Sequence, residues 1–277
     1  MQKGVPGTKS QRPRAFRPRG RACVAGVFLV LLLLAPVRAG AVESRSLTLA
    51  GQGYRLVELD LAHDALELRW RDREGHAINS IEGLREWGAR HGRTLEFATN
   101  AGIYDRALRP LGLHVEEGQT LRALNTTPGA ARAGNFSLQP NGVFFVDRAG
   151  RAGVVTTERW HAHPVDARLA SQSGPMLVID GAINPAFDAG STSLKWRSGV
   201  CAPEPGRVVF LVSDVPVSFH AFARAFRDGV GCRDALFLDG TLSRIWTPAE
   251  GYAGAPPVMV KPYAGMFAVF APATPDD

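Results

Sequence analysis

The sequence predicts an α+β fold: a single domain with a mixed, largely antiparallel β-sheet, several β-hairpins, and helices packed on the sheet. Strand-like alternation of apolar and polar residues dominates the chain, and short turn segments typical of β-hairpins separate many of the strands. Only two segments show clear helical periodicity. A doubly wound parallel fold would need regular alternation of strands and helices, which the sequence lacks.

The first part of the mature chain has the pattern of half-buried strands. Apolar residues alternate with polar ones through residues 47–70, as expected for strands with one buried face. A helix capped by Asn79 or Ser80 is expected to run to about residue 91. A short strand at residues 94–99 follows.

Two β-hairpins are expected next. In the first, residues 111–115 turn back into residues 120–124. In the second, residues 135–138 turn through an Asn-Gly pair, a strong hairpin signal, into residues 143–146. A further turn leads to a strand at residues 154–155.

In the second half, apolar strands end abruptly on carboxylates. Such runs end at Asp180, Asp214 and Asp239. Continuous apolar runs of this length are typical of buried strands. A helix capped by Ser218 separates the last two runs and is expected to end near Gly229. A Pro- and Gly-rich stretch then precedes a final strand at residues 266–271.

The N-terminal segment has the features of a secretory signal peptide, expected to span residues 1–39. It holds eight Lys and Arg residues and no Asp or Glu, so the formal charge falls from +6 for the whole chain to −2 for residues 40–277. The apolar core at residues 22–35 is shorter than the roughly 20 residues that span a bilayer. We therefore expect a periplasmic or secreted protein that meets a membrane only through its leader. An uncleaved anchor is the alternative.

Export bears on the cysteines and on possible partners. Cys201 and Cys232 would lie in an oxidising compartment, where they are expected either to form a disulfide or to remain two buried thiols.

The near-neutral mature chain gives no reason to expect nucleic-acid binding, which relies on phosphate neutralisation. His161 and His163 would share a strand face, but two ligands without a third make a weak metal site. We expect no metal and no cofactor.

Several strands deliver polar groups to their ends, which predicts a polar cleft at one edge of the sheet. The segments concerned are residues 97–102, 176–181, 210–214 and 236–240, together with Arg197. An arginine pairs bidentately with phosphate or carboxylate. Aspartate and asparagine can hold sugar hydroxyls or activate water. Considered alone, Asp239 could equally be a simple turn cap.

Four ordered motifs resemble the phosphodiester glycosidase family, whose namesake is N-acetylglucosamine-1-phosphodiester alpha-N-acetylglucosaminidase. They are NAGIY at residues 100–104, QSGPML at 172–177, RSGV at 197–200 and LDGTLS at 238–243. The resemblance covers roughly residues 95–270 and is strongest to a branch of exported bacterial proteins. It implies hydrolysis of a sugar-1-phosphodiester in envelope or extracellular glycans, with a sugar-phosphate or glycan as the partner.

The resemblance also suggests roles for individual residues. Asp239 is the expected general acid/base or positioning carboxylate, Arg197 the phosphodiester-binding cation, and Asn100 a ligand of the phosphate or sugar hydroxyls. Glycoside hydrolysis usually employs a second carboxylate, for which Asp180 and Asp105 are candidates. The remaining expected substrate-binding residues are Gly102, Gln172, Ser173, Gly174, Gly240 and Ser243.

Two departures from the family pattern leave a second function open. Ala101 stands where the family has glycine, and Thr241 and Leu242 replace glycines after the Asp-Gly pair. Their side chains would narrow the space beside the backbone. The alternative function is a non-catalytic envelope protein that binds glycan or an anionic polymer in the same cleft.

Overall fold

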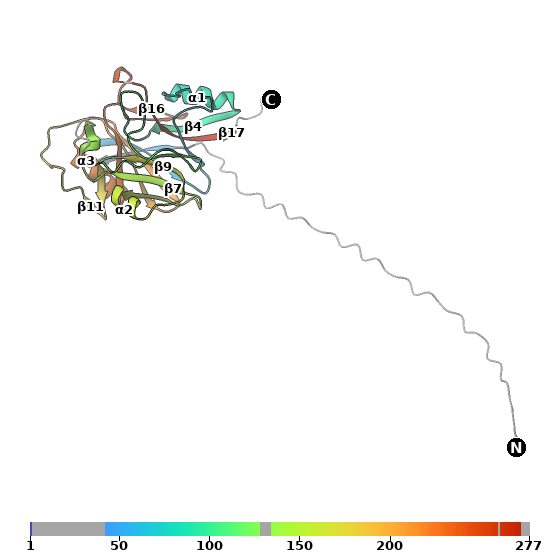
Figure 1. Ribbon diagram of the computed structural model, residues 1–277. Helices are drawn as coiled ribbons and strands as arrows, with labels where there is room; N and C mark the ends of the chain where they lie inside the picture. Colours follow the sequence, from blue (N-terminus) through green and yellow to red (C-terminus); the bar gives the residue numbers. More distant parts are fainter. Residues whose placement is uncertain (2–41, 128–133, 260, 273–277) are drawn as a thin grey trace. The chain divides into compact units, whose positions relative to one another are not determined.

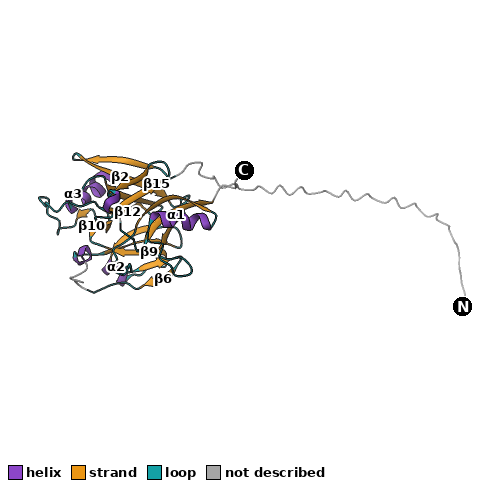
Figure 2. Cartoon of the chain, turned by 90° about the horizontal axis from the view of Figure 1, so that it is seen from above, coloured by secondary structure: helices purple, strands orange, loops and turns teal. Residues whose placement is uncertain are grey.

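The computed structural model describes residue 1 and residues 42–127, 134–259 and 261–272. From residue 42 onward, the described residues form three antiparallel β-sheets with short helices packed on them (Figures 1 and 2). The expected α+β fold is therefore confirmed. Among the described residues, no helix combines the length and apolar character needed to cross a bilayer. The expected signal peptide lies outside the described residues.

The largest sheet has seven strands in the order β1-β2-β13-β12-β14-β10-β11. Their bounds are β1 Ser44–Leu49, β2 Gln52–Asp60, β10 Met176–Ile179, β11 Ala182–Ile183, β12 Ser198–Glu204, β13 Arg207–Ser213 and β14 Ala235–Asp239. Strand β12 pairs antiparallel with both β13 and β14, and Ser198 is the partner of Asp239 in the second pairing. The N-terminal end of β12 and the C-terminal end of β14 therefore lie side by side.

Each of the other two sheets has five strands. The second sheet has the order β16-β15-β4-β17-β3, formed by β3 Leu66–Arg69, β4 Arg93–Asn100, β15 Arg244–Thr247, β16 Gly251–Gly254 and β17 Met266–Pro272. The third has the order β6-β5-β9-β7-β8, formed by β5 His114–Glu116, β6 Gln119–Arg122, β7 Gly142–Asp147, β8 Ala152–Thr156 and β9 Ala167–Ser173.

The helices are short and capped by hydroxyl side chains. Helix α1 (Ile81–Arg90) begins after Ser80, whose side chain accepts a hydrogen bond from Gly83 N, as expected from the sequence. Thr156 and Ser218 cap α2 (Thr157–Ala162) and α3 (Phe219–Arg224) in the same way. A π-helical segment, η2 (Ala225–Val230), continues α3. Two 3-10 turns complete the set, η1 (Gly134–Ser137) and η3 (Pro257–Met259).

One apolar core joins all three sheets. Phe97 of β4, Phe144 of β7 and Phe210 of β13 belong to one buried cluster, and each contributes a ring from a different sheet. The outer face of each sheet is covered by a helix through its own apolar cluster. Helix α1 covers the β4–β17 region (Figure 1), α3 with η2 covers the large sheet, and Trp160 of α2 packs on the third sheet.

Three local expectations were wrong. Residues 135–137 lie on η1, so the segment before the Asn-Gly pair forms no hairpin with β7, which instead pairs with β8 and β9. His161 and His163 lie at the end of α2 and do not share a strand face. The Pro- and Gly-rich stretch contains the β15–β16 hairpin, which the sequence did not predict. The expectation that the helix after Ser218 ends near Gly229 is confirmed, because η2 ends at Val230 and the left-handed Gly231 caps it.

Candidate functional site

A cleft of about 610 Å³ opens at the end of β14, where the large sheet meets the second sheet. Its wall comes from the segment before β12, the first residue of α3, the β14–β15 turn and the η3 segment. The lining residues are Ser193, Lys195, Arg197, Phe219, Asp239, Gly240, Thr241, Leu242, Val258, Met259 and Lys261. Asp239 and Arg197, the two principal candidates from the sequence, therefore line the same cleft. Thr241 and Leu242 form part of its wall and leave it open.

Asp239 is the carboxylate that lines this cleft. It is the last residue of β14 and is partly exposed, whereas the four residues before it are buried. The desolvation caused by the surrounding protein raises the pKa of Asp239 to about 6, although the Gly240 N–H donates to Oδ1 at 2.6 Å and opposes the rise. A carboxyl group with this pKa can exchange a proton near neutral pH.

Buried polar side chains hold the backbone of Asp239. Ser198 Oγ accepts hydrogen bonds from Asn100 Nδ2 at 2.8 Å and from Asp239 N at 3.3 Å. Ser243 Oγ donates to the Asp239 carbonyl at 2.7 Å and lies 2.9 Å from Ser198 Oγ. Asn100 Oδ1 also accepts from Arg244 N, at 3.3 Å. These contacts join the two sheets and leave the Asp239 side chain free to face the cleft.

Arg197 is a buried cation without a counter-charge. Its side chain is about 1% exposed. Nε donates to the Val217 carbonyl at 2.8 Å and Nη2 to the Ser193 carbonyl at 3.2 Å, while the guanidinium lies 3.6 Å from the Phe219 ring centroid. Among the described residues no carboxylate lies within ion-pair distance of it, and burial lowers its pKa to about 10. An anion entering the cleft would supply the missing charge.

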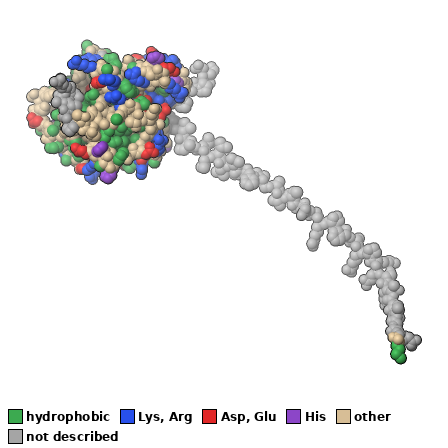
Figure 3. All heavy atoms as spheres, viewed as in Figure 1, with side chains coloured by type: hydrophobic (Ala, Val, Ile, Leu, Met, Phe, Trp, Pro, Cys, Tyr) green, Lys and Arg blue, Asp and Glu red, His purple; other side chains and the backbone are tan. Residues whose placement is uncertain are grey.

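Two lysines extend the positive charge of the cleft. Lys195 and Lys261 are exposed and line its wall. Neither makes an ion pair with another described residue. On the face drawn in Figure 3, basic side chains lie among those of Asp and Glu. The cleft combines three cations that have no ion-pair partner among the described residues with one carboxylate.

Two tyrosines lie close enough to Asp239 to interact with its charge. Burial, and then the negative charge of Asp239, raise the pKa of Tyr104. Burial and Asp239 also raise the pKa of Tyr263, against the opposing effect of Arg244. The Tyr104 hydroxyl donates to the Pro262 carbonyl at 2.6 Å, and the Tyr263 hydroxyl donates to the Leu242 carbonyl at 2.9 Å. Both therefore fix loops that border the cleft.

Four of the expected substrate-binding residues make hydrogen bonds or close packing contacts with other parts of the protein. Gln172 accepts hydrogen bonds from Leu113 N and Asn125 N through Oε1, and its Nε2 donates to Asn125 O and Thr157 Oγ1. Ser173 Oγ donates to the Leu238 carbonyl at 3.0 Å, which supports β14 just before Asp239. Gly102 and Gly174 are sites of close packing, where an added Cβ would lie 2.6 Å from Gln172 O and 1.8 Å from Asn141 Oδ1 respectively.

The candidate second carboxylates do not line the cleft. Asp180 is exposed and pairs with Arg159 at 2.7 Å, and that hydrogen bond lowers its pKa. Asp105 accepts from Ala107 N and Arg109, and these bonds outweigh desolvation and lower its pKa. Asp180 follows β10, which runs antiparallel to β14. The C-terminal ends of antiparallel neighbours point in opposite directions. Asp180, after the C-terminal end of β10, is therefore separated from Asp239, at the C-terminal end of β14.

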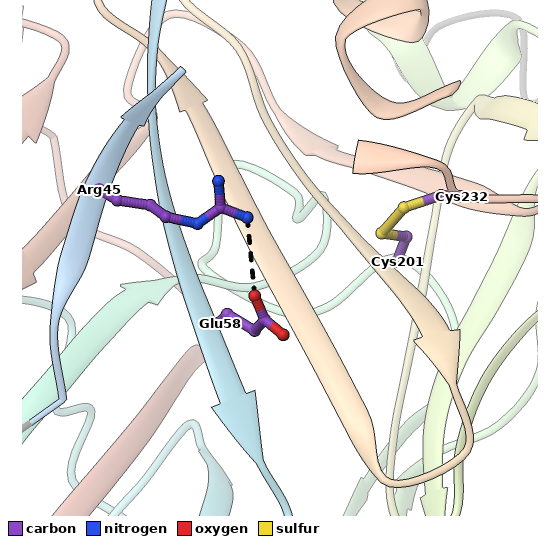
Figure 4. The surroundings of a disulfide bond; sticks show 4 residues. All are labelled: Arg45, Glu58, Cys201 and Cys232. Carbon is purple, nitrogen blue, oxygen red and sulfur yellow. Dashed lines mark ion pairs between the residues drawn. A yellow bond between two sulfur atoms is a disulfide. The ribbon is translucent and has the colours of Figure 1, made fainter. Parts of the chain in front are cut away.

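Cys201 and Cys232 form a disulfide with a Cα–Cα distance of 6.3 Å. Cys201 lies within β12, opposite Ala235 of β14, and Cys232 lies in the segment that leads into β14. Figure 4 shows the cross-link to the right of the Arg45–Glu58 ion pair, which lies across β1 and β2 of the same sheet. The disulfide therefore ties β12, which begins at Ser198, to the segment that leads into β14, which ends at Asp239.

Sequence reasoning missed several residues of the cleft. Lys195 had a usable signal, because it precedes Arg197 by two residues and alternate residues of an extended chain face the same side. Phe219 directly follows the expected helix cap Ser218, and no pattern in the sequence marked it as part of a site. Lys261 lies in the Pro- and Gly-rich stretch, which offered no periodic pattern, and so does Tyr263, which supports the cleft wall through the Leu242 carbonyl. Within the described residues, Asp72, Glu74 and His76 place ligand atoms within 4.8 Å of one another, and none of the three lines the cleft.

Comparison with known proteins gives three findings. The family model described as phosphodiester glycosidase matches residues 93–248. An uncharacterized protein of Escherichia coli strain K12, YigE, is 33% identical over 246 residues, covering 88% of this chain and 91% of that protein. The fold is similar to the zebrafish N-acetylglucosamine-1-phosphodiester alpha-N-acetylglucosaminidase catalytic domain auto-inhibited by its pro-peptide, with a TM-score of 0.56 and 14% identity over 86% of this chain and 84% of that one.

A hypothetical protein from Synechocystis has a similar fold, with a TM-score of 0.52 and 13% identity. The match covers 82% of this chain and 61% of the Synechocystis chain. At these identities the two solved structures support the fold alone.

Proposed function

Because this chain belongs to the phosphodiester glycosidase family, we propose that it is an exported hydrolase that cleaves a sugar-1-phosphodiester bond in envelope or extracellular glycans. The observation that carries the proposal is the open cleft shared by Asp239, whose pKa is raised, and Arg197, which lacks a counter-charge. One group can move a proton and the other can bind a phosphate, as this reaction requires.

In the proposed reaction Asp239 accepts a proton from the attacking water, whose oxygen bonds to the anomeric carbon of the sugar. The bond between that carbon and the phosphate oxygen breaks, and its electron pair leaves with the phosphomonoester. Arg197 neutralises the negative charge that develops on the phosphate. Phosphate is a good leaving group, so one carboxylate suffices, in contrast to ordinary glycosidases that use two.

The remaining polar residues of the site would act as positioning residues in this proposal. Asn100, Ser198 and Ser243 hold the backbone of Asp239 through hydrogen bonds, as described above. Gly240 keeps one carboxylate oxygen fixed through its N–H. A preorganised carboxylate loses little freedom in the transition state, which favours catalysis.

Export is supported by two features. The sequence predicts a signal peptide at residues 1–39, and the Cys201–Cys232 disulfide fits an oxidising compartment. Fractionation of a bacterium expressing the full chain, followed by N-terminal sequencing of the product, tests this part. Export predicts a periplasmic or secreted protein that begins near residue 40. A full-length cytoplasmic product with free thiols would contradict it.

Release of free sugar from a panel of α- and β-linked sugar-1-phosphodiesters tests the activity, with N-acetylglucosamine included because the zebrafish relative's name specifies it. We expect turnover by the purified protein and a loss of at least a hundredfold in Asp239→Asn, in the range that general-base catalysis contributes. Asp180→Asn is the matched control, because that carboxylate pairs with Arg159 and does not line the cleft. It should retain wild-type activity.

The dependence of kcat/KM on pH gives a second test. Since ionised Asp239 is the active form in this proposal, activity should fall as the pH drops below about 6. Binding of sugar phosphates without turnover of any member of the panel would instead support the non-catalytic glycan-binding protein.

A further inference from the structure

The distribution of lysine in this chain is uneven. The sequence has lysines at positions 3, 9, 195 and 261 only, whereas the other residues of its Lys and Arg total are all arginine. The first two lie in the expected leader. Both remaining lysines line the cleft that holds Asp239 and Arg197. Both flexible ammonium groups outside the expected leader therefore line this cleft, and the remaining Lys and Arg positions of the domain are arginine.

Lysine and arginine offer different contacts to an anion. The planar guanidinium of Arg197 is fixed by the Val217 and Ser193 carbonyls and by Phe219, so it presents a rigid fork deep in the cleft. Lys195 and Lys261 are exposed point charges on flexible chains, and neither is paired with a carboxylate in the described part of the chain. They can follow an anionic group that extends from the Arg197 site toward solvent.

The charges of the cleft exceed the charge of a simple substrate. Three cations and one ionised carboxylate give a formal charge of +2 for the lining residues. A sugar-1-phosphodiester carries a single negative charge and would leave one positive charge unmatched. A sugar linked through a diphosphate carries two negative charges and would balance the lining.

We propose that Lys195 and Lys261 form a second phosphate subsite beside Arg197, so that the preferred substrate class is a sugar joined to its leaving group through a diphosphate. The inference rests on the proposed function for its reaction and adds the substrate class. Arg197 binds the phosphate attached to the anomeric carbon, and the lysines bind the next phosphate of the leaving group. Hydrolysis consumes one water and releases the free sugar and a diphosphate monoester.

Lysine footprinting tests the subsite without turnover. Amine acetylation followed by mass spectrometry reports Lys195 and Lys261 individually, because the mature chain has no other lysine side chain. Inorganic pyrophosphate should slow the modification of both lysines at concentrations about tenfold or more below those needed with inorganic phosphate, a ratio expected for added charge-assisted contacts. Equal protection by the two anions, or none, would overturn the proposal. Raised salt should reduce the difference.

A matched pair of substrates tests the preference in catalysis. The two esters carry the same sugar and the same alkyl tail, joined through one phosphate or two, so that contacts with the apolar Val258 and Met259 are equal. The diphosphate ester should have a kcat/KM at least tenfold higher, mainly through a lower KM. In the double variant Lys195→Gln/Lys261→Gln this ratio should fall close to one, whereas Arg148→Gln, which removes a surface arginine paired with Asp166, should preserve it.

The outcomes separate the two proposals. Hydrolysis of both esters with similar efficiency, together with unprotected lysines, would refute the diphosphate subsite and leave the phosphodiester glycosidase function intact. Hydrolysis of neither ester would refute the proposed function. Footprinting with pyrophosphate would still decide whether the lysines form a phosphate subsite.

Discussion

Replacing Asp239 by asparagine should stabilise the folded protein while it removes activity. Burial raises the pKa of this carboxyl group from 3.8 to about 6. Each pKa unit corresponds to about 1.4 kcal/mol, so ionised Asp239 destabilises the folded state by about 3 kcal/mol at neutral pH. Asparagine carries no charge, and its Oδ1 can still accept the Gly240 N–H. The cleft gives the new amide access to water.

The sign of the effect follows from proton linkage. Between pH 3.8 and about 6 the folded state binds more protons at Asp239 than the unfolded state does, so its contribution to stability falls as pH rises through this window. The stabilisation of Asp239→Asn should therefore be absent near pH 3.5 and complete above pH 7. For a domain of this size, about 3 kcal/mol corresponds to a rise of roughly 6–12 °C in Tm.

Equilibrium urea unfolding at several pH values, with the disulfide intact, measures this difference. Asp228→Asn is an informative control, because hydrogen bonds from Arg227 and Arg224 lower the pKa of Asp228 to about 2. Its removal should destabilise the protein at pH 7.5, opposite in sign to Asp239→Asn. The reasoning is refuted if Asp239→Asn is no more stable than wild type at pH 7.5, or if its advantage is the same at pH 4 and pH 7.5.

Three further outcomes follow from the contacts around the cleft. Ser198→Ala should lower the free energy of unfolding by about 1–3 kcal/mol and reduce kcat, since Asn100 Nδ2 and Asp239 N lose their acceptor; unchanged kcat would show that these bonds do not position the carboxylate. Gly102→Ala should destabilise the fold, because its Cβ would lie 2.6 Å from the Gln172 carbonyl, whereas Gly206→Ala, with open space around it, is the control. Cys201→Ser/Cys232→Ser should lower stability by roughly 4 kcal/mol, as expected for a cross-link across 31 residues; an unaltered urea midpoint in non-reducing buffer would contradict this.

The sequence was sufficient for the fold class and for selecting two residues, Asp239 and Arg197, that line one cleft. Apolar runs predicted the buried strands that end at Asp180 and Asp239, and hydroxyl caps predicted helices α1 and α3. Arg197 and Asp239 were selected from motifs that lie far apart in the chain, and the structure has both in one cleft. Local patterns carry this information because side-chain periodicity and capping depend on near neighbours.

The position of a strand's end in space depends on partners that local patterns do not specify. The sequence analysis expected the C-terminal ends of several strands to lie together on one side of a sheet. This expectation is correct only for strands that run in the same direction. Strand β10 is antiparallel to β14, so Asp180 lies at the opposite edge and pairs with Arg159. The β15–β16 hairpin was not predicted, because its residues, which include two glycines, lack a strong alternation of apolar and polar side chains.

The hydrogen bonds among Asn100, Ser198 and Ser243 have a consequence for when activity can arise. Asn100 and Ser198 are 98 residues apart in sequence, and Asn100 and Arg244 are 144 apart. Contacts of such long range form late, because the chain must close large loops first. If the proposed function holds, a nascent or partly folded polypeptide therefore contains Asp239 and Arg197 without the geometry that lets them act, and it would not hydrolyse sugar phosphates until the whole domain has assembled.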